Sequence, residues 1–170
     1  MLLLLKFLWF LFVMDNIDIR ILTEIQQDSS LTNQELADRV GLSPSPCLRR
    51  VKALEESGVI EKSVTLLNQR MLGLTLTVFI HISMDRHTPD RFDLFESTLS
   101  TYPEVKSLRL VTGQSADYLV EAVVEDMDKY QELLLGRITR IPGVTDIQSS
   151  FLLRSVIDRT SLPLEHLAKK

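Results

Sequence analysis

Residues 31–60 read LTNQELADRVGLSPSPCLRRVKALEESGVI and contain the signals for two short helices. Thr32 and Glu35 have the spacing of a capping box, in which each side chain accepts a hydrogen bond from the backbone N–H of the other residue. Gly41 is expected to end the first helix, because a left-handed residue closes many helices and glycine adopts this conformation without steric cost. The segment therefore predicts a short capped helix followed by a tight turn.

A second helix is expected from Ser43 to Ser57. Serine is a favoured N-cap, and Pro44 suits the first helical position, where no N–H is needed. The residues predicted to face the core from this helix are Cys47, Leu48, Val51 and Leu54. Upstream, apolar residues at helical spacing predict another helix over residues 17–28. Three short helices with a tight turn between the last two form a helix-turn-helix, and residues 59–67 are expected to add a small β-hairpin, or wing.

The exposed side of the Ser43–Ser57 helix predicts contact with DNA. Between Arg39 and Lys52 there are four basic residues and no acidic one. The N-terminal part of such a helix enters the major groove, where an arginine suits guanine, and the free N–H groups at helix starts suit phosphates. The residues predicted to bind DNA are Ser43, Ser45, Arg49, Arg50, Lys52 and Lys62. The alternative is an ordinary amphipathic helix with a solvated basic face.

From residue 74 onward the apolar spacing changes from the helical period to alternation, which is typical of strands. The expected elements are a strand at 74–84, a helix at 88–102, strands at 105–111 and 118–124, a helix at 126–141 and a strand at 144–156. This β-α-β-β-α-β order predicts a ferredoxin-like fold, in which both helices cover one face of a four-stranded antiparallel sheet. The other face commonly pairs with another copy, so we expect at least a homodimer. The fold class is α+β.

Composition narrows the function further. The 170 residues carry a formal net charge of −4, so attraction to nucleic acid must come from a local basic surface. A single cysteine, Cys47, cannot form an intramolecular disulfide, and a reduced cytoplasmic setting is expected. The three histidines lack metal-ligand spacing, and no glycine-rich phosphate loop is present. We therefore expect no enzymatic activity, no catalytic residues, no metal and no cofactor.

The apolar leader MLLLLKFLWFLFVM ends at Met14. It is shorter than the roughly 20 apolar residues that a membrane span needs, and it lacks the basic start and small-residue cleavage site of a signal peptide. We favour Met14 as the natural start, with residues 1–13 as a misassigned upstream extension. The alternative is an apolar helix that packs on this protein or on a partner.

The chain resembles the Lrp/AsnC, or feast/famine, family of transcription regulators from Met14 to about Leu167. The resemblance rests on NIDIRIL and the run from Ser43 to Ile60, and then on YPEV, VTG with DYL, and IPGV. It implies a winged helix-turn-helix domain, a linker, and a RAM-type ferredoxin-like domain that dimerises and binds small molecules, with dimers assembling into octamers or similar. The expected domains are residues 14–65 for DNA binding, 66–73 for the linker and 74–170 for dimerisation and effector binding.

The resemblance also implies an amino-acid effector, bound near the turn at Gly113. Backbone N–H groups of such a turn suit a carboxylate, and Asp117 suits an ammonium group. The residues predicted to bind the effector are Thr112, Gly113, Gln114, Ser115, Asp117, Gln148 and Ser149. The alternative is a plain hairpin turn with a satisfied aspartate. The chain departs from the family in having three residues rather than two between Gly113 and Asp117, and Lys62-Ser63 where the wing often has Gly-Tyr.

These observations predict a cytoplasmic, sequence-specific transcriptional regulator whose assembly and DNA affinity respond to an amino acid or a related small metabolite. Its expected partners are double-stranded DNA with a pseudo-palindromic site, the effector and further copies of the chain, with no membrane. Two alternatives stay open: an architectural protein that wraps DNA with little sequence choice, and a metabolite-binding protein that does not act on DNA.

Overall fold

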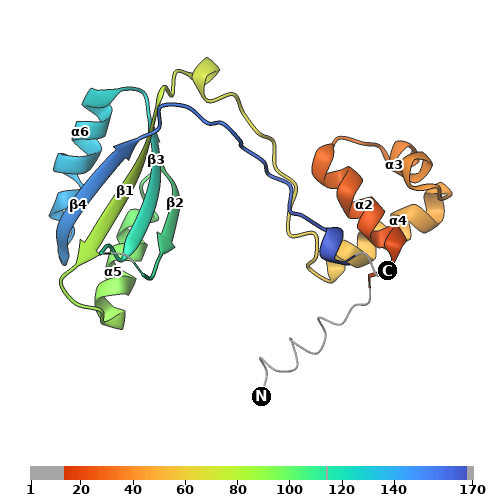
Figure 1. Ribbon diagram of the computed structural model, residues 1–170, viewed down its shortest axis with the longest axis horizontal. Helices are drawn as coiled ribbons and strands as arrows, with labels where there is room; N and C mark the ends of the chain where they lie inside the picture. Colours follow the sequence, from red (N-terminus) through yellow and green to blue (C-terminus); the bar gives the residue numbers. More distant parts are fainter. Residues whose placement is uncertain (1–13, 114, 168–170) are drawn as a thin grey trace. The chain divides into compact units, whose positions relative to one another are not determined.

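The computed structural model describes residues 14–113 and 115–167, and the chain divides into two compact units. One unit contains residues 14–65 together with residues 157–167, and the other contains residues 66–156 (Figure 1). The apolar leader, residues 1–13, lies outside the described residues, so the expectations for it stay predictions. Within the described ranges, no helix combines the length and the apolar character that crossing a membrane requires.

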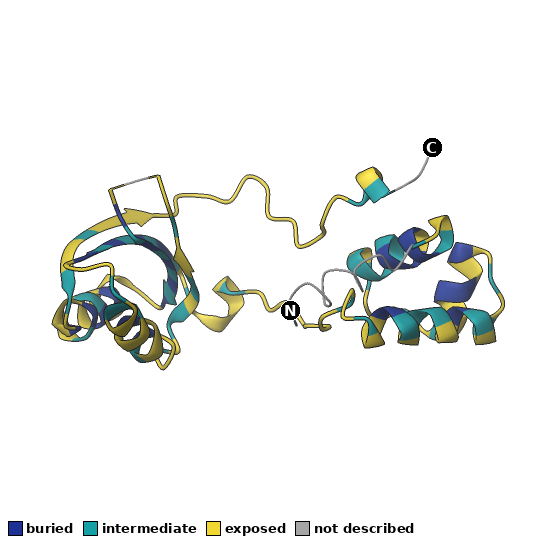
Figure 2. Ribbon diagram, turned by 90° about the horizontal axis from the view of Figure 1, so that it is seen from below, coloured by how far each residue is buried: buried dark blue, intermediate teal, exposed yellow. Residues whose placement is uncertain are grey.

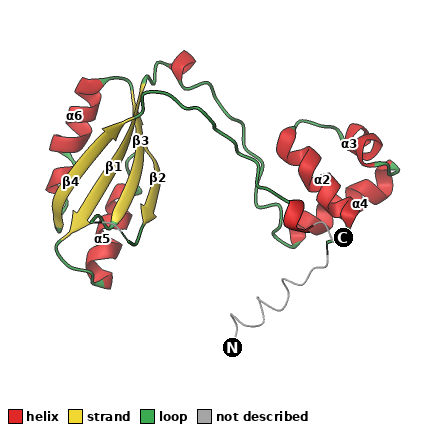
Figure 3. Cartoon of the chain, in the orientation of Figure 1, coloured by secondary structure: helices red, strands yellow, loops and turns green. Residues whose placement is uncertain are grey.

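The N-terminal unit is built from the three helices that the sequence predicts (Figure 3). They are α2 (Asn16–Gln27), α3 (Asn33–Val40) and α4 (Pro44–Glu56). Their inward sides form one apolar cluster, while their outward sides are exposed (Figure 2). The buried members of the cluster are Ile21, Leu22, Leu36, Ala37, Val40, Cys47 and Leu54. Burial of these faces stabilises helices that would be marginal alone, since 8 to 13 residues are too few for an isolated helix in water.

Local capping determines where α2 begins and where α3 begins and ends. The predicted capping box is confirmed: Thr32 N donates to Glu35 Oε2 over 2.8 Å, and Glu35 N donates to Thr32 Oγ1 over 3.3 Å. Gly41 ends α3 with φ of 74°, the left-handed conformation predicted for it. The structure adds a second capping box, Asp15 with Asp18, at the start of α2. These three helix boundaries therefore follow from signals within a few residues.

Two predictions for this unit are wrong. Leu48, expected in the core, is 44% exposed, because it lies roughly 100° around α4 from Cys47, whereas Leu54 lies almost directly below Cys47. No strand forms over residues 59–68, so the expected hairpin is absent from this part of the chain. Residues 61–63 offer none of the glycine or asparagine signals of a tight hairpin turn, and an isolated two-stranded hairpin is at best marginally stable.

The second unit has the β-α-β-β-α-β order that the sequence predicts. Its elements are β1 (Leu76–Met84), α5 (Pro89–Leu99), β2 (Val105–Leu110), β3 (Tyr118–Val124), α6 (Met127–Gly136) and β4 (Val144–Phe151). The four strands form one antiparallel sheet in the order β2-β3-β1-β4. The last strand ends at Phe151 rather than at residue 156, because β1 begins at Leu76 and offers no backbone partner beyond the Leu152 N–H bond to the Thr77 oxygen.

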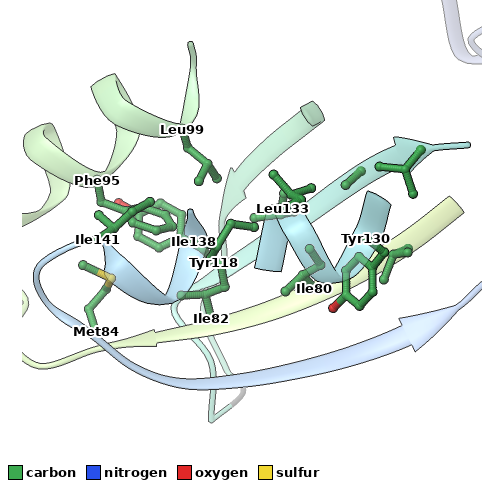
Figure 4. Close-up of a cluster of buried hydrophobic side chains, with 14 residues drawn as sticks. Ile80, Ile82, Met84, Phe95, Leu99, Tyr118, Tyr130, Leu133, Ile138 and Ile141 are labelled. Atoms are coloured by element: carbon green, nitrogen blue, oxygen red, sulfur yellow. The ribbon is translucent and has the colours of Figure 1, made fainter. Parts of the chain in front are cut away.

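Both helices of this unit pack on the same face of the sheet and enclose its core (Figure 4). Alternate residues of β1 and β3 point into this core and meet side chains of α5 and α6. The largest fully buried side chains here include Phe95, Leu99, Tyr118, Leu133 and Ile138. Residues on the other face, among them Phe79, His81, Leu119 and Glu121, are only half-buried, and neither α5 nor α6 of this unit covers them.

The C-terminal tail, residues 157–167, belongs to the helical unit and not to the second domain, where the sequence predicts it. The Gln26 side chain holds the Leu162 backbone on both sides: Leu162 N donates to Gln26 Oε1 over 2.7 Å, and Gln26 Nε2 donates to the Leu162 oxygen over 3.4 Å. Leu164 packs against the apolar cluster of the three helices. The apolar side chain of Leu164 is therefore partly buried against the helices α2 to α4.

Candidate DNA-binding surface and effector site

The outward face of α4 is exposed, and residues 44–54 of the helix include basic but no acidic side chains. Ser45, Leu48, Arg49 and Lys52 are all exposed, and they follow one another around the side of the helix opposite Cys47. Arg49 and Lys52 form no ion pair with any of the residues that the structure describes. The surface therefore presents two positive charges that no described acidic side chain pairs with, on the helix that follows the tight turn at Gly41. In a helix-turn-helix, this second helix enters the major groove.

Arg50 differs from its neighbours because it is half-buried and paired with two aspartates of the α2 region. Its Nη1 lies 2.7 Å from Asp18 Oδ1 and 2.8 Å from Asp15 Oδ2. The hydrogen bonds that Arg50 donates to Asp18 and Asp15 raise the pKa of its guanidinium. The pKa of Asp15 is lowered, first by the hydrogen bond from the Asp18 backbone and also by Arg50. Arg50 thus joins α4 to the start of α2, which leaves its guanidinium occupied in the structure.

The start of α4 offers fewer backbone donors than a typical helix N-terminus. Pro44 and Pro46 have no N–H, and the Cys47 N–H donates to the Ser43 oxygen over 3.2 Å. Among residues 44–47, only Ser45 therefore has an N–H that makes no hydrogen bond to another described residue. The Ser43 side chain, exposed beside it, makes no capping hydrogen bond. This geometry corrects the expectation of several open N–H groups here: a phosphate would meet Ser45 N–H and nearby hydroxyl groups.

The predicted DNA-binding residues therefore fall into two groups. Five are exposed, namely Ser43, Ser45, Arg49, Lys52 and Lys62. Four of these belong to α4 or its N-cap, whereas Lys62 lies on the extended segment after α4. The sixth, Arg50, is half-buried in its ion pairs with α2.

The predicted effector loop joins β2 to β3 at one end of the sheet. Thr112, Gly113 and Ser115 are exposed, and Gly113 has φ of 86°. Gln114 lies outside the described residues. Asp117 is already engaged, because its Oδ2 accepts the Met84 N–H over 2.7 Å and its Oδ1 lies 2.8 Å from His87 Nε2. The aspartate thus ties the loop to the end of β1.

The two predicted effector residues on β4 lie on opposite faces of the sheet. Ser149 pairs with Ile80 and hydrogen-bonds to the Tyr130 hydroxyl of α6, on the helix-covered face. Gln148 pairs with His81, so it lies on the uncovered face. The structure therefore does not bring them into one cleft, which corrects that expectation. The reason is the pleat itself, since successive side chains of a strand point to opposite sides.

Sequence reasoning missed two histidines near this loop. His87 reaches Asp117 from the segment between β1 and α5, and His81 lies between Leu119 and Gln148 on the uncovered face. The alternation of apolar and polar residues in β1 could have placed His81 on the uncovered face. For His87 there was no such signal, because a side chain in an irregular segment has no periodicity that predicts its neighbour.

A helix-turn-helix with an exposed basic face, followed by an antiparallel sheet unit with one uncovered face, defines a two-domain DNA-binding regulator. Family models agree with this class. Residues 14–61 match the winged helix-turn-helix DNA-binding model, and residues 77–162 match the Lrp/AsnC ligand binding domain. The chain belongs to the Lrp/AsnC family of transcriptional regulators. It is a ligand-responsive regulator of transcription, and its relatives are regulators rather than enzymes.

Individual relatives are similar over most of the chain. The leucine-responsive regulatory proteins of Klebsiella pneumoniae and of Escherichia coli strain K12 are each 41% identical over 143 residues, covering 84% of this chain and 87% of theirs. A transcriptional regulator from Neisseria meningitidis, solved as a complex with L-methionine, is 42% identical with a TM-score of 0.87, covering 91% of this chain and 99% of that one. An AsnC family regulator from Agrobacterium tumefaciens is 35% identical with a TM-score of 0.84, covering 90% and 99%.

Proposed function

We propose that this protein binds a specific DNA site through α4, and that an amino acid changes its affinity for that site. The observation that carries the proposal is the exposed face of α4, where Arg49 and Lys52, beside Ser45, form no ion pair with residues 14–113 or 115–167. Arg49 lies in the N-terminal half of the helix, where a guanidinium reaches guanine O6 and N7. Ser43, Lys52 and Lys62 are proposed to contact phosphates. Such contacts fix the position of the protein on the DNA but do not recognise the base sequence.

The uncovered sheet face supports self-association. Its centre combines Phe79, His81 and Leu119, half-buried side chains that a second copy would remove from water. A twofold pairing of two such faces gives a dimer with two reading helices, and two helices match a pseudo-palindromic site in successive major grooves. We propose a homodimer that assembles further, to an octamer or a similar closed particle.

The proposed effector is an amino acid with an apolar side chain. The named relatives are leucine-responsive proteins, and the Neisseria regulator was solved with L-methionine. In this chain the exposed loop of Thr112, Gly113 and Ser115 offers backbone N–H groups for a carboxylate. The loop borders the uncovered sheet face, so a ligand there would contact more than one copy. Such a ligand shifts the assembly if it binds one state better than another.

DNA binding and effector response are tested together in a gel-shift titration. The probe is the protein's own upstream region, the competitor is scrambled DNA, and leucine, methionine and aspartate are added in parallel. Arg49→Ala is expected to cost about 1–3 kcal/mol in binding and to relax the choice at one base pair. Arg140→Ala is the matched control, because Arg140 is exposed in the other unit.

The outcomes separate the possible functions. A shift that resists competitor and responds to leucine or methionine supports the proposal. A shift lost equally to scrambled DNA points to an architectural protein. Ligand binding with no shift at any salt concentration points to a metabolite-binding protein that does not act on DNA. A regulator acts where the chromosome is, so we place this one in the cytoplasm.

A further inference from the structure

Leu48 is an exposed apolar residue in the middle of the basic face of α4. Its side chain is 44% exposed, and it lies outside the apolar cluster that the three helices enclose. One helical turn separates it from Ser45 on one side and from Lys52 on the other. Leu48 thus occupies a position facing outward from the protein, between groups that suit a nucleic acid.

The charged residues around Leu48 indicate which kind of molecule binds this surface. Arg49 and Lys52 flank it, and the first acidic residues of α4 are Glu55 and Glu56, at the far end of the helix. Over residues 44–54 the helix carries basic and no acidic side chains, and an outward face of this kind suits a polyanion. This step rests on the proposed function, in which the same half of α4 enters the major groove.

We propose that Leu48 reads a thymine by contacting its C5-methyl group. Among the groups that base pairs present in the major groove, this methyl is the apolar one, and apolar side chains recognise thymine through it. Burying one methyl group against a leucine removes apolar surface from both partners. From the free energy of burying one such group, the contact is expected to change affinity about fourfold. Arg49 then selects a guanine and Leu48 a nearby thymine within each half-site.

The test removes the methyl group from the DNA and the side chain from the protein. In the site bound by the full chain, each thymine of the half-site is replaced in turn by deoxyuridine, which keeps the base pair but lacks the methyl. One position is expected to weaken wild-type binding about fourfold. Leu48→Ala is expected to bind the unmodified site with a similar loss and to become indifferent to deoxyuridine at that position.

Lys52→Ala is the matched control on the same face. It is expected to weaken binding to every probe and to keep the sensitivity to the missing methyl. Because Leu48 is exposed, its removal should leave the circular dichroism spectrum unchanged. The inference is overturned if wild type ignores every replacement, or if Leu48→Ala retains full sensitivity, while specific binding persists. Loss of specific binding by wild type itself would instead overturn the proposed function and this inference with it.

Discussion

Arg50 Nη1 lies 2.7 Å from Asp18 Oδ1, and this contact joins the reading helix α4 to the first helix of the unit, α2. Asp18 is almost completely buried, with 7% of its side chain exposed. Burying a carboxylate is costly unless an opposite charge pairs with it. Asp15 receives the same guanidinium at 2.8 Å. One arginine of α4 therefore stabilises the helical unit, while its neighbour Arg49 is exposed and unpaired among the residues that the structure describes.

Arg50→Ala is expected to destabilise the helical unit by about 1–3 kcal/mol, because it leaves the buried Asp18 carboxylate without its charged partner. The measurement is hydrogen exchange of peptides from α2 to α4, which reports on this unit separately from the sheet unit. Arg49→Ala, one residue away and exposed, should change exchange little and impair DNA binding instead. Equal exchange in the two variants would contradict the assigned role of Arg50.

The helical unit is expected to lose stability in acid. Hydrogen bonds lower the pKa of Asp15 in the folded state, the Asp18 backbone bond being the largest cause. A lowered folded pKa contributes stability that is complete above the unfolded value, and this contribution disappears as pH falls through the folded value, below about pH 4. Urea unfolding followed by circular dichroism at several pH values measures the loss. Asp15→Asn should flatten the dependence, and an unchanged slope in this variant would count against the assignment.

Phe79→Glu is expected to weaken self-association at least roughly tenfold, because it places a charge at the centre of the uncovered sheet face. Leu135→Glu is the matched control: Leu135 is 60% exposed on α6, in the layer that covers the opposite face. Sedimentation velocity over a range of concentrations compares the two. If both variants associate like wild type, the copies meet through another surface.

The C-terminal tail is expected to stabilise the helical unit through Leu164. Leu164→Ala removes half-buried apolar surface and should cost about 1–2 kcal/mol, seen as faster hydrogen exchange in α2. Leu153→Ala is the control, since Leu153 is 93% exposed on the segment after β4. Exchange in the β-sheet should be the same in both variants. Faster exchange confined to the sheet would place the tail's contribution elsewhere.

The sequence predicted nearly all helices and strands, because their signals act over a few residues. The box of Thr32 with Glu35 begins α3, and Gly41 ends it with positive φ. The alternation of apolar and polar residues predicted β1. The β-α-β-β-α-β order then predicted the ferredoxin-like sheet, in which both helices bury their apolar sides against one face. The prediction of a hairpin at residues 59–67 was wrong, because apolar spacing alone does not form a strand without a partner strand or a turn residue.

The candidate sites were predictable to a lesser extent. The exposed basic residues of α4 were found because a helical repeat separates its two faces, although Leu48 lay near the boundary and was misassigned. Alternation alone would also have placed Gln148 and Ser149 on opposite faces of β4. By contrast, Asp117 meets the Met84 N–H and His87 only because the β2–β3 loop folds against the end of β1.

The amino-acid order by itself therefore determined the elements, their sequence along the chain and the basic face of the reading helix, since caps and periodicity are local. The tertiary structure decided which charged side chains remain available to contact DNA. Arg50 is taken by Asp18 from 32 positions away, and Leu162 is held by Gln26 across 136 positions. Such pairs have no local signal, because burial and electrostatic compensation depend on which distant residues the folded chain brings together.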